Sequence, residues 1–139
     1  MNESGLIRDL LTSTRTIAVF GYSPRPDRPS NSVSRTLRAH GYRVIPVNPA
    51  LRGAVVEGEP SYERLVDIPK DANVGFVDVF RRGEYLDAVV DDAIAAGIKA
   101  IWFQLDLGNV AAAQRADEAG MRVVWDRCTA IELGRLGRT

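Results

Sequence analysis

The chain has 139 residues, of which 45% are hydrophobic, and this suits a single domain over residues 1–139 with a sizeable core. Its 18 basic and 18 acidic residues cancel, so we expect neither nucleic acid nor a membrane as a partner. One cysteine excludes an internal disulfide, and without a signal peptide or an apolar run near about 20 residues we expect a cytoplasmic protein.

The first half of the chain predicts helices and strands in alternation. Apolar residues at helical spacing over residues 6–11 predict a short amphipathic helix, which precedes a strand over Thr16–Phe20. A second helix over residues 30–39 ends at Gly41, because glycine readily adopts the left-handed conformation that closes helices. Arg43–Val47 is the next predicted strand, and turn-forming residues follow it.

The second half continues this alternation. Residues 61–66 predict a short helix that is capped by Ser61 and ends before Pro69. After it, three predicted strands alternate with three predicted helices. The strands cover residues 74–80, 99–103 and 122–125, and the helices cover residues 83–96, 109–119 and 129–136.

The alternating pattern predicts an α/β fold. Strands that are apolar on both faces indicate a parallel sheet with helices on each side. Right-handed crossovers then give a Rossmann-like, doubly wound sheet of five strands, for which we predict the order 3-2-1-4-5. A ligand should lie at the carboxyl ends of the strands, where the chain places residues 21–28, 48–52, 80–82, 104–107 and 126–128.

The turn after the first strand has the features of a nucleotide-binding corner. Gly21 ends the strand, and the polar residues 30–32 suit the N-cap of the next helix, whose free N–H groups attract anions. The dinucleotide fingerprint is absent, because Ser23 and Pro26 stand at its second and third glycines. We interpret Gly21 as allowing close approach of a ligand, with a turn that needs positive φ as the alternative.

The second strand ends without the acidic residue that an NAD-binding fold uses to hold the ribose hydroxyls. Asn48 and Pro49 stand there instead. Arg25, Arg28 and Arg52 lie in the first two loops, and guanidinium groups bind phosphates through paired hydrogen bonds. Each arginine alone could be a solvated surface residue, but their grouping favours a ligand with an extra phosphate.

Several motifs, in the same order along the chain, resemble the small CoA-binding proteins. They are Gly-Tyr-Ser-Pro-Arg-Pro at residues 21–26, Gly-Tyr-Arg-Val-Ile-Pro-Val-Asn-Pro at 41–49, Val-Asp-Val-Phe-Arg-Arg at 77–82, Trp-Phe-Gln at 102–104 and Asp-Arg-Cys at 126–128. That family is similar to the nucleotide-binding domain of the succinyl-CoA synthetase α subunit, standing alone without the domain that carries the phosphohistidine.

The resemblance implies coenzyme A as the cofactor and assigns its binding residues. The turn that would hold the pyrophosphate comprises Gly21, Tyr22, Ser23, Pro24 and Arg25. The residues that would border the 3′-phosphate and adenine are Asn48, Pro49 and Arg52. The residues that would line the rest of the cleft are Val79, Phe80, Arg81, Phe103 and Gln104.

No set of residues in the sequence predicts catalysis or a metal site. His40 stands at a predicted helix end, away from the ligand, where it suits the helix dipole better than a catalytic role. Cys128 could face the pantetheine arm as a reactive thiol or lie buried and inert. Asp78 and Asp126 lack a supporting partner for acid–base chemistry.

The sequence therefore predicts a module that binds CoA or acyl-CoA without catalysis of its own. A second protein is a possible partner of this module. Two alternatives stay open. One is an NAD(P)-dependent oxidoreductase, and the other is a protein-interaction domain with a vestigial nucleotide site.

Overall fold

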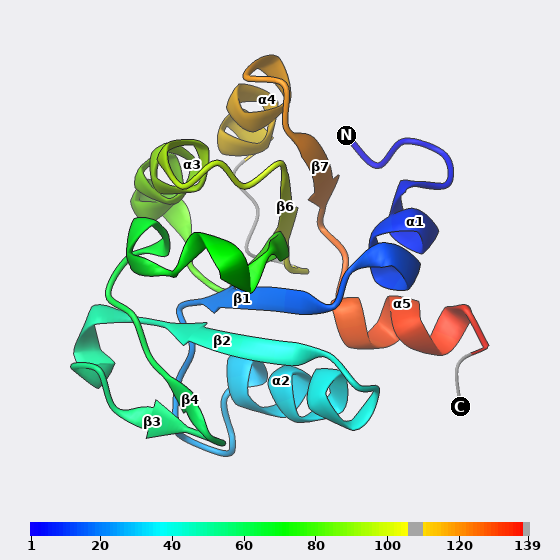
Figure 1. The fold of residues 1–139 in the computed structure, drawn as a ribbon. Helices are drawn as coiled ribbons and strands as arrows, with labels where there is room; N and C mark the ends of the chain where they lie inside the picture. The colour runs from blue at the N-terminus through cyan, green and yellow to red at the C-terminus, as the bar shows by residue number, and fades with distance from the viewer. Residues whose placement is uncertain (106–109, 138–139) are drawn as a thin grey trace.

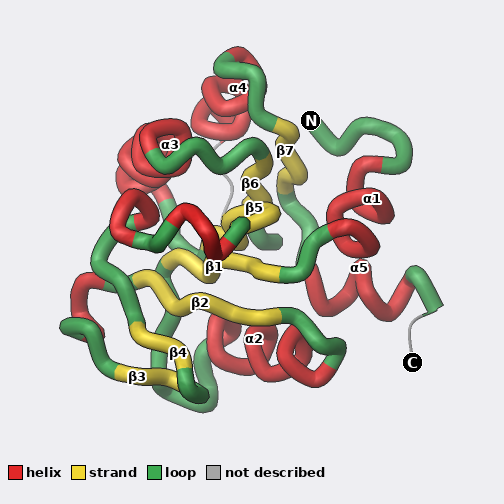
Figure 2. Tube along the Cα trace, viewed as in Figure 1, coloured by secondary structure: helices red, strands yellow, loops and turns green. Residues whose placement is uncertain are grey.

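A computed structural model describes residues 1–105 and 110–137, and its centre is a parallel sheet of five strands (Figures 1 and 2). The strands lie in the order β2-β1-β5-β6-β7. Their bounds are β1 Thr16–Phe20, β2 Arg43–Val47, β5 Val74–Val79, β6 Ala100–Phe103 and β7 Arg122–Trp125. The predicted α/β class and the five-stranded, Rossmann-like parallel sheet are confirmed.

Helices cover both faces of the sheet, as Figure 1 shows. One face packs against α1 (Leu6–Ser13), α2 (Pro29–Ala39) and α5 (Thr129–Arg135). The other face packs against α3 (Leu86–Ala95) and α4 (Val110–Glu118). Among the described residues, no helix is both long and apolar enough to cross a lipid bilayer.

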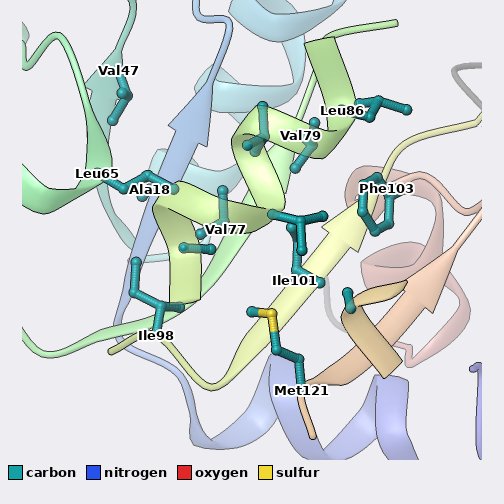
Figure 3. Packing of buried hydrophobic residues seen from close by; sticks show 14 of the residues in the cluster. Ala18, Val47, Leu65, Val77, Val79, Leu86, Ile98, Ile101, Phe103 and Met121 are labelled. Carbon is teal, nitrogen blue, oxygen red and sulfur yellow. The ribbon is translucent and has the colours of Figure 1, made fainter. Parts of the chain in front are cut away.

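Alternate residues of each strand supply the two cores, because successive side chains of a strand point to opposite faces. On the α3–α4 face, Val77 and Val79 of β5 meet Ile101 and Phe103 of β6. Figure 3 shows these four side chains gathered with Leu86 of α3. The other face has its own cluster, which includes Ile17, Val19, Phe76, Trp102 and Val124.

The third long strand, β5, does not lie where we predicted it. The order 3-2-1-4-5 would put it beyond β2, but it pairs with β1 on one side and with β6 on the other. The place of a third Rossmann strand, outside β2, is taken by a single parallel bridge from Tyr62 to Val47. In Rossmann numbering β2, β1, β5 and β6 thus occupy positions 2, 1, 4 and 5, with a one-residue remnant at position 3.

The prediction of a helix over residues 61–66 is also wrong, because this segment lies beside β2. The Tyr62 N–H donates to the Pro46 carbonyl at 3.1 Å, and the Asn48 N–H donates to the Tyr62 carbonyl at 2.9 Å. These bonds hold the segment extended along β2. A two-stranded hairpin that we did not predict comes before this segment. It consists of β3 (Val55–Val56) and β4 (Glu59–Pro60), and its turn contains Glu57 and Gly58, both with positive φ.

Short 3-10 turns lie in the connections from β2 to β5 and from β5 to α3, at η1 (Pro49–Leu51), η2 (Leu65–Asp67), η3 (Lys70–Ala72) and η4 (Gly83–Tyr85). At the opposite side of the sheet, Asn2 covers the outer edge of β7. Its backbone N–H donates to the Val123 carbonyl at 2.9 Å. Its side-chain amide pairs with Trp125, accepting from the backbone N–H at 2.7 Å and donating to the carbonyl at 2.9 Å.

Gly75 at the start of β5 leads to a test of packing. A Cβ at Gly75 would lie 2.5 Å from Oγ1 and 2.9 Å from Cβ of Thr14, a side chain that is itself buried. Because Thr14 is short and branched at Cβ, it cannot move aside, and Gly75→Ala should lower the free energy of unfolding by about 1–3 kcal/mol. Urea unfolding followed by circular dichroism measures this change.

Gly134 in α5 provides the matched control. It has nothing within 4 Å of an added Cβ and no positive φ, so Gly134→Ala should stabilise the helix by up to about 1 kcal/mol. Equal effects from the two substitutions would contradict the packing argument.

Candidate functional site

A cleft of about 700 Å³ opens at the carboxyl edge of the sheet. It runs across the ends of all five strands, between the first turns of α2 and α5. The lining residues are Gly21, Ser23, Arg25, Arg28, Pro29, Ser30, Val33, Asn48, Phe80, Arg81, Arg82, Gln104, Leu105, Cys128 and Ile131. This is the edge where the predicted ligand site should lie.

Gly21 begins the turn between β1 and α2, and the protein itself requires a glycine there. Its φ is +86°, and an added Cβ would lie 3.2 Å from both the Phe80 carbonyl oxygen and Cγ of Arg81. The Gly21 N–H donates to the Val47 carbonyl at 2.8 Å. Gly21 therefore has the positive φ that we gave as the alternative interpretation. The segment that approaches it closely in the structure is the chain just after β5.

Ser30 and Asn31 hold the same turn from inside α2. The Ser30 hydroxyl accepts from the Ser23 N–H at 2.9 Å, and the Asn31 amide donates to the Ser23 carbonyl at 3.0 Å. The expectation that residues 30–32 form the N-cap is wrong. The N-cap is Arg28, which makes no side-chain capping bond. Pro29 begins the helix, and because proline has no N–H, this position has no backbone donor that would need a hydrogen-bond partner.

Asn48 ties the ends of three strands together. Its side-chain nitrogen donates to the Tyr22 carbonyl at 2.9 Å, after β1. Its side-chain oxygen accepts from the Ala50 N–H at 3.0 Å and from the Arg81 guanidinium at 3.4 Å. Asn48 therefore fixes the β2 loop against the glycine turn and positions Arg81 at the cleft.

One half of the cleft is cationic, although the whole chain is neutral. Its lining includes Arg25, Arg28, Arg81 and Arg82, and among the described lining residues there is no carboxylate or imidazole. Arg81 also stacks over Tyr85, with its guanidinium carbon 5.7 Å from the ring centre. Arg25 is paired at 3.4 Å with Asp27, but both side chains are exposed, so water screens this pair strongly.

Beneath the other half lies a buried polar cluster. The Gln104 side-chain nitrogen donates to Asp78 and, at 3.1 Å, to the Thr129 hydroxyl, which in turn donates to Asp78 at 2.9 Å. Burial raises the pKa of the Asp78 carboxyl from 3.8 to about 7, and the hydrogen bonds from Gln104 and Thr129 oppose that rise. The sequence showed Asp78 without a partner, because both partners are distant in the chain, with Gln104 just after β6 and Thr129 at the start of α5.

The structure brings about half of the predicted binding residues into this cleft. Those that line it are Gly21, Ser23, Arg25, Asn48, Phe80, Arg81 and Gln104. The side chains of Val79 and Phe103 do not reach it, because they belong to the core on the α3–α4 face. Tyr22 is buried, with its hydroxyl accepting from the Asn31 amide at 3.2 Å, and Pro24, Pro49 and Arg52 lie outside the lining.

Pro29, Val33 and Ile131 also line the cleft, and the sequence analysis gave them no part in binding, whereas Ser30 and Leu105, which line it too, lie in segments that it singled out. Two of the strand-end segments that we singled out, 104–107 and 126–128, do border it through Gln104, Leu105 and Cys128, although residues 106 and 107 lie outside the described residues. Val33 and Ile131 gave no comparable signal, since they enter the cleft only through the packing of α2 and α5.

Comparison with known protein families agrees with this geometry. The model of the CoA binding domain matches residues 15–134, nearly the whole chain. The chain belongs to the CoA binding domain family. YneT of Bacillus subtilis is 36% identical to it over 125 residues, which is 90% of each protein.

Solved structures show the same family fold. A protein from Pyrococcus horikoshii OT3 is 40% identical, with a TM-score of 0.85 over 94% of this chain and 89% of its own. A protein from Thermus thermophilus is 36% identical, with a TM-score of 0.87 over 98% and 99%. An acetyl-coenzyme A synthetase from Ca. Korarchaeum cryptofilum is 25% identical, with a TM-score of 0.67 over 88% of this chain and 27% of the synthetase.

The buried Asp78 predicts a dependence of stability on pH. Its pKa is higher in the folded protein than in the unfolded chain, so the folded state holds the proton more tightly between about pH 4 and 7. Raising the pH through this window should therefore remove stability, by up to about 1.4 kcal/mol per pH unit. Asp78→Asn has no proton to lose there.

The measurement is urea unfolding of both proteins at several pH values. The free energy of unfolding of the wild type, relative to that of Asp78→Asn, should fall as the pH rises from about 4 to 7. Parallel curves over this range would show that Asp78 does not titrate with a raised pKa.

Proposed function

We propose that this protein binds coenzyme A in the cleft at the carboxyl edge of the sheet, without a catalytic step of its own. The observation that carries this proposal is the group of four cleft arginines beside the glycine turn, with no carboxylate among the described lining residues. Coenzyme A carries a diphosphate and a 3′-phosphate, and arginine binds such groups through charge-assisted hydrogen bonds. Membership of the CoA binding domain family supports the same ligand.

In this proposal the diphosphate lies against the turn that begins at Gly21, near Arg25 and Arg28. Arg81 and Arg82 face it from the end of β5. The 3′-phosphate and adenine lie toward η1, where Asn48 and Arg52 begin and end the turn. Tyr22, Pro24 and Pro49 contribute through the backbone of these loops, as Val79 and Phe103 do at the strand ends.

The cleft suits CoA better than a dinucleotide that lacks the third phosphate. An NAD site usually holds the ribose with a carboxylate at the end of β2. Here Asn48 stands in that place, and its side-chain oxygen already accepts two hydrogen bonds within the protein. An interaction domain with a vestigial site is the other alternative, and it predicts no binding of any nucleotide.

Titration calorimetry with CoA, dephospho-CoA, NAD⁺ and NADP⁺ separates these possibilities. We expect CoA to bind more tightly than any of the other three. Tighter binding of NAD⁺ or NADP⁺ would favour an oxidoreductase, and no binding of any ligand would favour the vestigial site. A thiol reagent added to the protein with acetyl-CoA tests for thioester cleavage, and we expect no release of thiol.

Arg28 provides a test of the cationic half. Arg28→Ala removes a charge-assisted contact with phosphate and should weaken CoA binding by roughly tenfold or more. Arg8→Ala is the matched control, because Arg8 is an exposed arginine on α1 that does not line the cleft. If both substitutions weakened binding equally, the effect would reflect net charge and not a contact in the cleft.

Arg52 tests the position of the 3′-phosphate. Its φ of 50° is left-handed, so Arg52→Asn removes the charge with a residue that tolerates this backbone. The substitution should weaken CoA by roughly tenfold while changing the affinity for dephospho-CoA little, because only CoA carries the 3′-phosphate. Equal losses for both ligands would move Arg52 to the diphosphate, and no loss for either would remove it from the site.

A further inference from the structure

The cleft changes character from one side of the sheet to the other. Its arginines all follow β1 or β5, and Asn48 follows β2. The lining residues that follow β6 and β7 are Gln104, Leu105, Cys128 and Ile131, and none of them is an arginine, lysine, aspartate or glutamate. Because the strands lie in the order β2-β1-β5-β6-β7, the cleft has a cationic end and a neutral end.

The neutral end has a polar floor that is fixed in orientation. The Gln104 side-chain nitrogen is engaged by both Asp78 and Thr129, which orients the amide. Its oxygen accepts no hydrogen bond from the described residues, and Gln104 lines the cleft. An oriented carbonyl oxygen of this kind suits an N–H donor, and the pantetheine arm of CoA carries two amide N–H groups.

Apolar side chains from three different elements line the same cleft. Val33 comes from α2, Leu105 follows β6, and Ile131 comes from α5, which packs against α2. Leu105 is 41% exposed and Ile131 is 47% exposed. A single exposed aliphatic side chain is ordinary on a protein surface, but two that line the same cleft as the arginines point to an apolar part of the same ligand.

We propose that the ligand is an acyl-CoA whose aliphatic acyl chain lies on Val33, Leu105 and Ile131. This inference rests on the proposed binding of CoA and specifies the class of CoA compound. The cleft then offers a partner for each of three parts of one molecule. The arginines bind the phosphates, the Gln104 oxygen accepts from the amide arm, and the apolar end covers the acyl chain.

The experiment measures affinity against chain length by calorimetry with CoA, acetyl-CoA, butyryl-CoA and hexanoyl-CoA. Full burial of one methylene raises affinity by about fourfold, and an open cleft buries roughly half of a chain. Hexanoyl-CoA should therefore bind roughly tenfold or more tightly than acetyl-CoA. Ile131→Ser should reduce this ratio at least threefold, and because the ratio compares two ligands of one protein, it does not depend on the variant's affinity for CoA itself.

Ile94→Ser is the matched control, because Ile94 is 44% exposed on α3 and does not line the cleft. It should leave the chain-length series unchanged. Equal binding of CoA and all acyl-CoAs by the wild type would overturn the acyl proposal and leave CoA binding intact. A loss of chain-length dependence in both variants would also overturn it, whereas no binding of any of the four compounds would overturn the proposed function.

Discussion

Helices cover both faces of the parallel sheet, so a ligand cannot reach either face and must bind at the ends of the strands. In this protein the constraint is strict, since residues of all five strands are packed into two hydrophobic clusters. The carboxyl ends meet at one edge, and the polar and cationic residues that follow the strands gather there. Asp78, the one acidic residue in the five strands of this sheet, accepts hydrogen bonds from Gln104 and Thr129, and its raised pKa is the consequence of burial.

The sequence predicted the elements whose signals are local. Continuous apolar runs placed the five long strands within about one residue of their observed bounds, and the fold class followed from their alternation with helices. Where long-range pairing decides the structure, local signals failed. Ser61 and Tyr62 have the pattern of a helix start, but hydrogen bonds to Pro46 and Asn48 make the segment extended. The place of β5 beside β1 likewise depends on contacts that no local pattern encodes.

The candidate site shows the same division. The sequence identified the glycine turn, the arginines and Asn48, because chain order alone puts the ends of parallel strands at one edge. It could not tell which side chain of each strand end faces the cleft. Val79 and Phe80 are neighbours, yet Val79 lies in the α3–α4 core and Phe80 lines the cleft. That choice depends on which face of the sheet α2 and α5 cover, which only the packed structure decides.

Both outer edges of the sheet are occupied by short pieces of the same chain. Tyr62 bonds to the edge at β2, and Asn2 bonds to the edge at β7 through its backbone and side-chain amide. Unpaired strand edges are the usual route by which sheets of separate molecules join. A strand from another molecule would first have to displace Tyr62 or Asn2, so both edges of the five-stranded sheet are protected against growth by pairing with a neighbouring molecule.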